Sequence, residues 1–426
     1  MATHRNTDLL IIGAGPFGLA MAAYAQHLGI DHVIAGKAMD FWQANMPKGM
    51  YLRSACDWHL DPMNQATIEA YLDTMGPAPA DVEPLSLDFY LGYTRWFQAQ
   101  KQIDAAPVFV QRLDTHNENG GGFRATLADG GSIRARYVVV ALGFKHFKHV
   151  PEDLRPLLPA GRFEHTCDLV DFTTLSGKRC LIIGGRQSAF EWTALIREAG
   201  AAAIHVSHRH DSPAFTAADW SWVNPLVDAM VDDPGWFCNL TPAQKDEVNH
   251  RLWAEGRLKV EPWLASRVLQ EPVTLWPNTR VSACREVANG EIEVTLNTGD
   301  HFLVDHVVLA TGYKVNMARI PLLADGNLLA QLHTRNDFPI LDEHFQTNIP
   351  GLYVTSMPAT QDFGPFFAFT ISVRTSARLI GRDIWQKQAT EAYLEEPARR
   401  GKPSKFEAAM SKVADVEAKG YDRLER

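Results

Sequence analysis

LLIIGAGPFG, residues 9–18, is the stretch that decides the fold. An apolar run is followed by three glycines, Gly13, Gly15 and Gly18, and then by a stretch of helical character. In such a turn the first glycine permits a tight bend, the second lets the backbone approach a pyrophosphate, and the third lets the next helix pack on the strand. The helix, which we expect to begin near Pro16 and Phe17, offers free N–H groups to the phosphates. The stretch predicts a dinucleotide site, with a merely structural turn as the alternative.

A second turn of this kind lies about 170 residues further on, in CLIIGGRQSA, residues 180–189. Arg186 replaces the second glycine and Ala189 the third, a position where alanine is tolerated. An arginine crowds the backbone approach, but its guanidinium can itself reach a phosphate. The alternative is a surface arginine that points to solvent. We predict a second dinucleotide site formed by Gly184, Arg186, Gln187, Ser188 and Ala189.

The two halves of the chain also repeat beyond their glycine turns. Residues 138–143 read VVVALG and residues 307–312 read VVLATG, again about 170 residues apart. Three segments that lead up to each of them alternate apolar and polar residues around turns, which predicts a three-stranded antiparallel meander. The expected strands are residues 108–113, 123–127 and 133–140 in the first half and residues 279–284, 291–296 and 302–309 in the second. A duplicated nucleotide-binding lobe explains this order better than chance does. We therefore predict an α/β fold with two Rossmann-like dinucleotide-binding domains, each with an antiparallel β-meander.

One of these domains is expected to be inserted into the other. Residues 1–160 and 305–385 would form the first, discontinuous domain, and residues 161–304 the second. Within the second, residues 211–275 show no clear period and form an insertion rich in aromatic residues, including Trp220, Trp222, Trp236, Phe237, Trp253 and Trp263. Residues 386–426 are charged and Ala-rich with helical spacing, and are expected to form a C-terminal helical extension or a frayed tail.

The composition of the 426 residues narrows the class of protein. A net charge of -9 argues against a general affinity for nucleic acid or for an anionic membrane surface. The polar, charged N-terminus leads directly into a strand, so we expect no secretion signal and a cytoplasmic location. The five cysteines include no Cys-x-x-Cys pair, which argues against electron transfer to a disulfide, and no spacing in the chain suggests a metal site.

The ends of the second strand in each half lack the acidic residue that often binds a ribose. The first half reads Ala35-Gly36-Lys37, so either main-chain groups and Lys37 hold that end of the cofactor or ribose recognition is weak. The second half reads Ser207-His208-Arg209, a cationic cluster where a 2'-phosphate would sit. This favours NADPH over NADH, with a solvated basic loop as the alternative.

With these motifs in order, the chain resembles the FAD- and NADPH-dependent class B flavoprotein monooxygenases, which include flavin-containing monooxygenases and amine N-hydroxylases. The resemblance spans roughly residues 8 to 385. Its further motifs are Phe163-Glu164-His165-Thr166, Ala310-Thr311-Gly312-Tyr313 and Gly351-Leu352-Tyr353-Val354. Gln187-Ser188-Ala189 is most similar to the ornithine and lysine N-hydroxylases, which leans toward N-oxidation. The Baeyer-Villiger fingerprint and the asparagine that many flavin-containing monooxygenases place near the flavin are absent.

The resemblance implies that NADPH reduces FAD and that a C4a-hydroperoxyflavin passes one oxygen atom of O2 to a substrate. It also implies that the segment from Trp42 to Asp57 covers the flavin ring. Arg53 and Asp57 are then candidate catalytic charges, with a structural salt bridge as an equal alternative. The remaining cofactor-binding residues that the resemblance implies are Trp42, Leu52, Arg53, Ser54, Val110, Ala141, Gly143, Thr311 and Gly312.

The substrate is expected to be small and hydrophobic, heteroaromatic compounds included. The aromatic insertion and the run Phe363-Gly364-Pro365-Phe366-Phe367-Ala368-Phe369 would wall its pocket, although aromatic residues more often form plain core. An NAD(P)H-dependent flavin reductase that passes electrons to another acceptor is the main alternative function. A degenerate nucleotide-binding protein without turnover is the third, and self-association stays open.

Overall fold

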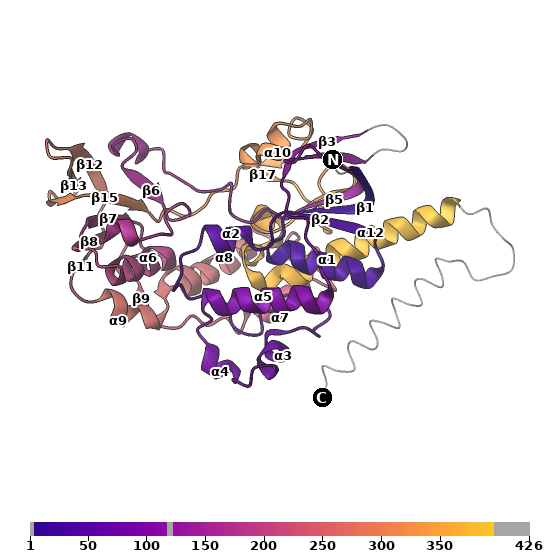
Figure 1. Ribbon diagram of the computed structural model, residues 1–426, viewed down its shortest axis with the longest axis horizontal. Helices are drawn as coiled ribbons and strands as arrows, with labels where there is room; N and C mark the ends of the chain where they lie inside the picture. The colour runs from indigo at the N-terminus through magenta and orange to yellow at the C-terminus, as the bar shows by residue number, and fades with distance from the viewer. Residues whose placement is uncertain (1–3, 117–121, 396–426) are drawn as a thin grey trace.

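The computed structural model describes residues 4–116 and 122–395. Two lobes are visible in Figure 1, one on the right around the N-terminal strands and one on the left around the strands of residues 163–309. The chain leaves the first lobe after residue 140 and returns to it after residue 309. The predicted class, an α/β fold with two dinucleotide-binding lobes, is confirmed.

The first lobe is built on a six-stranded sheet in which β5 is the shared strand. β5 pairs along one edge with β1, in parallel register from His4↔Ser132 to Ile12↔Val140. Its other edge pairs antiparallel with β4 over its first half and parallel with β18 over its last three residues. The strands are β1 (His4–Ile12), β2 (His32–Ala35), β3 (Val110–Thr115), β4 (Phe123–Leu127), β5 (Ser132–Val140) and β18 (Leu352–Val354).

Helices cover this sheet, and the first of them is the predicted one. α1 (Pro16–Leu28) begins with Pro16 and ends at Gly29, whose left-handed backbone caps the helix with N–H bonds to Ala25 and Gln26. α12 (Val373–Glu395) lies against α1, where Gly381 leaves room for the ring of Tyr24. The other helices of this lobe are α2 (Asp40–Ala44), α3 (Ile68–Asp73), α4 (Pro79–Val82) and α5 (Leu87–Lys101).

The second lobe repeats the plan with an all-parallel sheet in the order β11-β8-β7-β15-β6. Its strands are β6 (Phe163–His165), β7 (Arg179–Ile183), β8 (Ala203–Ser207), β11 (Val273–Trp276) and β15 (His306–Leu309), and α6 (Gln187–Glu198) follows β7. A separate antiparallel meander joins β12 (Val281–Glu286), β13 (Ile292–Leu296) and β14 (His301–Val304).

One strand expectation is corrected in this lobe. Residues 302–309 do not form a single strand, because the chain turns between β14 and β15 at Asp305. The Asp305 carboxylate accepts hydrogen bonds from the backbone N–H of Arg179 at 2.8 Å and from its Nε at 3.1 Å. These two bonds hold the turn after which the chain passes from the meander, at β14, to the parallel sheet, at β15. Since β15 belongs to the second sheet, we propose that the first domain resumes after Leu309 rather than at residue 305.

The aromatic insertion contains more regular structure than its sequence suggested. Its elements are β9 (Ala214–Phe215), α7 (Val223–Ala229), α8 (Pro242–Arg257), β10 (Lys259–Val260), η3 (Pro262–Leu264) and α9 (Ala265–Val268). It packs against the first lobe, because Leu252 of α8 shares a buried cluster with Trp58 and Phe366; α8 is labelled near the middle of Figure 1. The buried contact cluster is drawn from three segments of the chain: Trp58, Val223, Val227, Leu252, Phe366 and Ile371.

Short elements complete the chain, namely η1 (Arg155–Leu157), η2 (Thr173–Leu175), η4 (Met317–Arg319), α10 (Pro321–Ala324), β16 (Thr334–Arg335), β17 (Phe338–Pro339), η5 (Met357–Ala359), α11 (Thr360–Phe363), η6 (Pro365–Ala368) and η7 (Thr370–Ser372). The expected boundary at residue 386 is wrong, because α12 continues unbroken across it to Glu395. The rest of the predicted C-terminal extension, residues 396–426, lies outside the described residues. Over the part of the chain that is described, no helix has the length and apolarity needed to cross a bilayer.

Candidate dinucleotide sites and the junction between the lobes

The three glycines of the first turn are not all required by the fold. Gly13 has φ +107°, and a Cβ there would lie 2.5 Å from the carbonyl oxygen of Ala141. A Cβ on Gly18 would lie 1.8 Å from the carbonyl oxygen of Gly13. Gly15 is different, because its backbone is extended, with φ −82°, and a Cβ would meet no heavy atom within 4 Å. The protein itself does not require a glycine at position 15, so the free space there is available to a ligand.

The helix that follows this free space is prepared for an anion. α1 has no side-chain N-cap and no acidic residue in its first turn, so the N–H groups at its start have no internal acceptor. The buried side-chain polar atoms that have no hydrogen-bond partner among the described residues include Asn45 Oδ1, Tyr90 OH and Thr355 Oγ1 of the first lobe. Buried polar groups are nearly always satisfied. Open space, free N–H groups and unpaired polar atoms together fit a dinucleotide such as FAD.

The ribose end of this site lies where β2 ends. The N–H of Gly36 donates to the carbonyl of Ala106 at 2.9 Å, so the stretch that leads to β3 passes the end of β2. Val110 itself begins β3, which lies at the other end of the strand order β2-β1-β5-β4-β3. Lys37 is exposed and pairs only loosely with Asp40, at 3.9 Å. Asp40 is a carboxylate that the sequence reading overlooked, but Lys145 binds it at 2.8 Å. Asp40 is therefore engaged with two lysines, and the roles of Lys37 and Val110 at this end stay predictions.

The second turn reproduces the first in its backbone. Gly184 has φ +143°, and its Cβ would lie 2.4 Å from the carbonyl oxygen of Ala310, as that of Gly13 would from Ala141. Arg186 occupies the position of Gly15 with the same extended backbone, φ −116°, and is the N-cap residue of α6. Ala189 is fully buried at the position of Gly18. At the position of Gly15 the second turn therefore presents the Arg186 side chain to a ligand.

The basic cluster at the end of β8 contributes less charge than its sequence suggested. The Ser207 and His208 side chains are buried, and Ser207 Oγ lies 2.9 Å from Thr279 Oγ1. His208 packs against Gly185, where a Cβ would lie only 2.5 Å from its own Cβ, and burial lowers the pKa of His208. His208 Nε2 is buried without a hydrogen-bond partner among the described residues, so contact of Ser207 and His208 with a phosphate stays a prediction. Arg209 is the exposed cation of the three.

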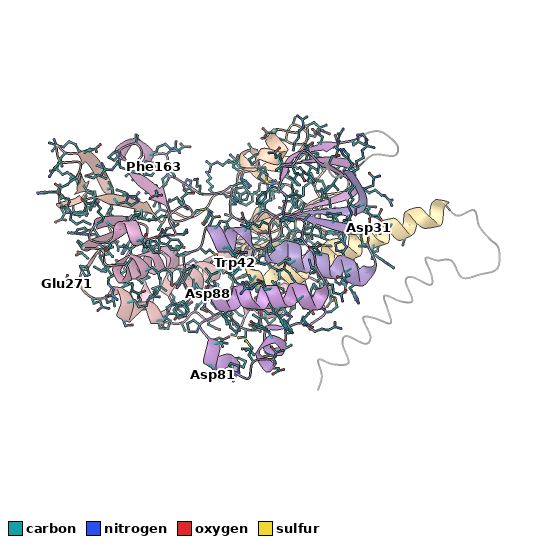
Figure 2. All side chains as sticks on the ribbon, in the orientation of Figure 1. Asp31, Trp42, Asp81, Asp88, Phe163 and Glu271 are labelled. Atoms are coloured by element: carbon teal, nitrogen blue, oxygen red, sulfur yellow. The ribbon has the colours of Figure 1, made fainter. Side chains whose placement is uncertain are left out.

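Contacts at Trp42, Leu52 and Ser54 help to hold the segment from Trp42 to Ser54 on the first lobe. Trp42 stacks on Tyr90 with ring centroids 4.9 Å apart and lies near the middle of the molecule in Figure 2. Buried Leu52 donates its N–H to the carbonyl of Leu85 at 2.8 Å. Ser54 Oγ lies 2.9 Å from Thr370 Oγ1. This segment is therefore positioned to form one wall of the space beside the first glycine turn.

The two candidate catalytic charges do not pair with each other. Arg53 Nε donates to Glu261 Oε1 at 2.6 Å, its Nη1 donates to the carbonyl of Gly256 at 2.8 Å, and its guanidinium lies 5.3 Å from the ring of Trp220. Asp57 instead accepts from Asn224 Nδ2 at 2.5 Å. Both partners lie in the aromatic insertion, so Arg53 forms a salt bridge between the lobes with Glu261, and not the structural pair with Asp57 that was the alternative. No sequence signal identified Glu261, which is 208 residues from Arg53.

The two connections between the lobes are bonded to each other. Cys167 donates its N–H to His165 Nδ1 at 3.0 Å, which leaves the proton of the neutral ring on Nε2, 3.0 Å from the carbonyl oxygen of Gly312. Burial lowers the pKa of His165, so the ring stays neutral. Thr311 Oγ1 donates to the carbonyl of His149 at 2.5 Å. Thr311 and Gly312 are thus part of the crossover between the two sites.

The aromatic run of residues 363–369 is mostly core. Phe363, Phe366 and Phe367 are buried, and Phe363 stacks on Phe345 with centroids 3.6 Å apart. Phe369 is 41% exposed. The aromatic rings that the insertion brings to the Arg53 segment are Trp220 and Trp263, which contact Trp58 and Tyr51 edge to face.

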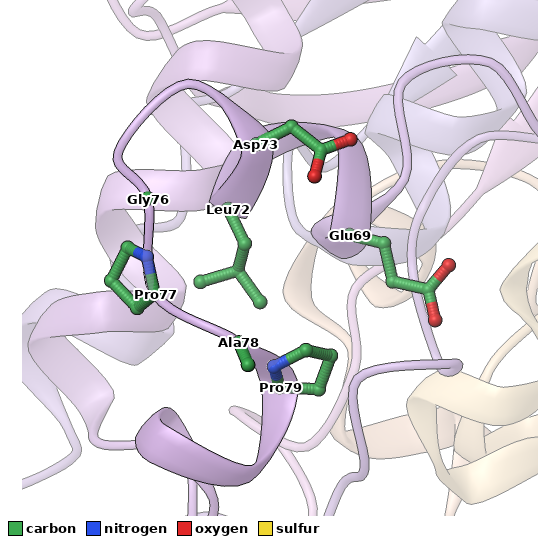
Figure 3. Close-up of a pocket in the computed structure, with 7 residues that line it drawn as sticks. All are labelled: Glu69, Leu72, Asp73, Gly76, Pro77, Ala78 and Pro79. Atoms are coloured by element: carbon green, nitrogen blue, oxygen red, sulfur yellow. The ribbon is translucent and has the colours of Figure 1, made fainter.

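Two open clefts lie away from both glycine turns. One, of about 460 Å³, lies between α3 and α4 and is lined by Glu69, Leu72, Asp73, Gly76, Pro77, Ala78 and Pro79 (Figure 3). The other, of about 380 Å³, is lined by His4, Arg5, Asn6, Arg124, Ser132 and Arg134. Neither contains a predicted site residue. Within residues 4–116 and 122–395, no group of three or more His, Cys, Asp or Glu side chains could hold a metal ion.

Known proteins share this arrangement. The chain is 27% identical over 215 residues to an FAD-dependent urate hydroxylase of Xanthomonas campestris, covering 47% of this chain and 44% of that protein. It is 27% identical over 230 residues to a ferredoxin–NADP reductase of Paraburkholderia phymatum, covering 51% of this chain and 55% of that protein. The chain thus spans about half the length of the curated relatives it matches.

The fold extends further than these sequence matches. An ornithine N-hydroxylase of Kutzneria superposes with a TM-score of 0.74 at 14% identity, covering 90% of this chain and 100% of that one. This likeness confirms the fold that the sequence resemblance implied. The family model described as pyridine nucleotide-disulphide oxidoreductase matches residues 10–233. Because this match covers more than half of the 426 residues, the chain belongs to the pyridine nucleotide-disulphide oxidoreductase family.

Proposed function

We propose that the protein is an FAD-dependent, NADPH-using monooxygenase that transfers one oxygen atom of O2 to a small hydrophobic substrate, heteroaromatic compounds included. The observation that carries the proposal is the pair of matched turns, in which Gly13 packs on Ala141 and Gly184 on Ala310 at nearly equal distances. Two dinucleotide sites in one chain are what a flavin and its nicotinamide reductant need. The names of the urate hydroxylase and of the ornithine N-hydroxylase support oxygen transfer.

In the first lobe, the residues would bind and enclose the flavin nucleotide. The free space at Gly15 and the N–H groups at the start of α1 would hold its pyrophosphate. When bound, FAD would accept a hydride from NADPH and activate O2. Trp42, Leu52 and Ser54 hold the covering segment in place, and the Arg53–Glu261 pair fastens it to the insertion. Arg53 and Asp57 would then act by excluding water and shaping the wall of the site.

In the second lobe, NADPH would bind at the start of α6. Arg186, at the N-cap position, would reach the pyrophosphate, and exposed Arg209 would pair with the 2'-phosphate. Charge-assisted bonds of this kind are stronger than neutral ones, so the two arginines replace the contacts that a second glycine and a ribose acid would make.

The substrate would meet aromatic rather than charged surface. Trp58, Trp220 and Trp263 surround the Arg53 segment, and Arg53 and Asp57 are already engaged by Glu261 and Asn224. A free charged amino acid would find few unengaged partners there. A flat, hydrophobic or heteroaromatic compound would be stabilised by stacking on such rings.

A reductase without oxygen transfer is the second candidate, because the ferredoxin–NADP reductase is similar over a comparable share of the chain. Transfer to a disulfide within the chain has no support, since all five cysteines are unpaired.

One experiment separates these functions. FAD-loaded protein is supplied with NADPH, isotopically labelled O2 and a panel of heteroaromatic compounds, and the products are analysed by mass spectrometry together with hydrogen peroxide. Label in an organic product supports the monooxygenase. NADPH oxidation that yields only hydrogen peroxide, or that needs an added electron acceptor, favours the reductase. Protein that stays colourless after addition of FAD contradicts both.

A further inference from the structure

Glu191 is a buried carboxylate that none of the binding roles above uses. It lies on α6 one helical turn after Gln187, the first residue of that helix, and has no exposed surface. Burial raises the pKa of Glu191, because the charged form loses its hydration. A carboxylate in this position is stable only where hydrogen bonds replace the lost water. Its partners therefore indicate what it does.

The best-placed partner of Glu191 is a backbone group of the other lobe. Tyr51 donates its N–H to Glu191 Oε1 at 3.1 Å. Arg267 reaches the same oxygen only at 3.4 Å and binds Glu198 more closely, at 2.7 Å and 2.9 Å. Oε2 has no hydrogen-bond partner among the described residues. The bond to Tyr51 is thus the main contact of this side chain.

The direction of the Tyr51 N–H follows from the extended backbone around it. Leu52 donates its N–H to Leu85, and Met50 accepts from Leu87 at 3.0 Å, both on the first lobe. In an extended segment successive N–H groups point to opposite sides, so that of Tyr51 points away from the first lobe. Glu191 receives it there. Residues 50–52 are therefore bonded on one side to the first lobe and on the other to α6.

A second tie joins the same two elements two residues later. Arg53 Nε donates to Glu261 Oε1 at 2.6 Å, and the N–H of Glu261 donates to Gln187 Oε1 at 3.2 Å. Tyr51 and Arg53 are thus both connected to the first turns of α6. That helix begins at the second glycine turn, where a dinucleotide phosphate would bind. A change at one site can be transmitted to the other through these bonds.

We propose that Glu191 is a positioning residue: its carboxylate holds the segment from Met50 to Arg53 in the place that lets a nicotinamide bound at α6 face a flavin bound in the first lobe. The inference rests on the proposed function for its two ligands. The contact itself is a property of the protein alone. Glu191 acts through the Tyr51 N–H as an acceptor, and its negative charge is not required.

Two conservative variants separate the bond from the charge. E191D keeps the charge but shortens the side chain by one methylene, so the carboxylate no longer reaches Tyr51. E191Q removes the charge but keeps an acceptor at Oε1, and its new NH2 takes the place of Oε2, which has no partner. E198Q is the matched control, a partly exposed carboxylate on the same helix that also binds Arg267. All are made in the full-length protein.

The readouts are amide hydrogen exchange at residues 50–53 and the single-turnover rate of flavin reduction by NADPH. E191D is expected to speed exchange about tenfold and to slow reduction about tenfold, with FAD content unchanged. E191Q and E198Q are expected to stay within about twofold of the parent protein. Exchange in E191D that equals that of the parent, or loss in E191Q as large as in E191D, overturns the proposal. If NADPH does not reduce the parent protein, the proposed function fails, while hydrogen exchange still decides the role of Glu191.

Discussion

Single glycines in the first turn separate stability from binding. Gly13 and Gly18 are required by the protein, because a Cβ at either would collide with a backbone carbonyl. Gly15 is not, because it has an extended backbone that any residue adopts and free space where its Cβ would be. The sequence pattern gives all three glycines equal weight. The structure shows that they have unequal roles.

Alanine at Gly18 should therefore affect mainly the stability of the protein, and alanine at Gly15 mainly the binding of FAD. G18A should destabilise the protein by about 3 kcal/mol, since the new Cβ overlaps the Gly13 carbonyl. G15A should cost only about 0.5 kcal/mol as a poorer N-cap, yet weaken FAD binding about tenfold or more, because the Cβ fills the space for the pyrophosphate. Thermal unfolding of the apoprotein and FAD titration measure the two effects. If G15A binds FAD as tightly as the parent protein does, the proposed pyrophosphate site at Gly15 is wrong.

Arg209 is the single residue expected to favour NADPH over NADH, by binding the 2'-phosphate. Ser207 and His208 are buried, which leaves Arg209 as the exposed cation at the end of β8. R209A should lower the preference for NADPH over NADH about tenfold, as expected for the loss of one charge-assisted bond to a phosphate. The ratio of kcat/KM for the two cofactors measures it. R285A, which removes an exposed arginine of β12, is the control. An unchanged ratio in R209A would assign the 2'-phosphate elsewhere.

Among the helices and strands, those predicted correctly are the ones that short-range sequence signals specify. β2, β8 and α1 follow the apolar runs and glycine signals closely, because a strand, a tight turn and a capped helix are short-range features. α8 was missed. Its stability depends on packing between the lobes, and its own sequence is largely polar, so no amphipathic period marks it.

The turn between β14 and β15 is held by the ion pair between Asp305 and Arg179. Hydrogen bonds from Arg179 hold the pKa of Asp305 down to about 2, from an ordinary value of 3.8. A depressed pKa means that the folded state is stabilised by the ionised form, so the contribution is complete above about pH 4 and is lost as the pH falls toward 2. D305N should therefore cost about 1–2 kcal/mol at neutral pH after allowance for partial solvent screening.

The same difference should shrink as acid is added. Denaturant unfolding of D305N and the parent between pH 7 and about pH 3 checks this, because the two stabilities should converge at the acid end. D300N, at an exposed turn of the same meander, serves as the control. A gap between D305N and the parent that does not change with pH would mean that the Asp305 charge plays no part in the turn.

At the scale of the whole molecule, the two lobes are joined by contacts from distant parts of the chain. The insertion places Gly256 and Glu261 against Arg53, and the linkers are bonded through His165 and Gly312. The apolar cluster of Trp58, Val223 and Phe366 lies at the same junction. Electron transfer between two bound cofactors depends on this geometry, because their reactive rings must meet between the lobes.

The sequence by itself determined the duplicated fold, the two glycine turns and the absence of a ribose acid at either strand end. These are local features, in which each residue acts on its neighbours through backbone conformation and hydrogen-bond reach. Only the tertiary structure decided that Arg53 pairs with Glu261, that Asp57 pairs with Asn224 and that His208 is buried. A charged side chain takes the partner that desolvation and distance select in three dimensions, and residues 208 positions apart carry no mark of their pairing in the sequence.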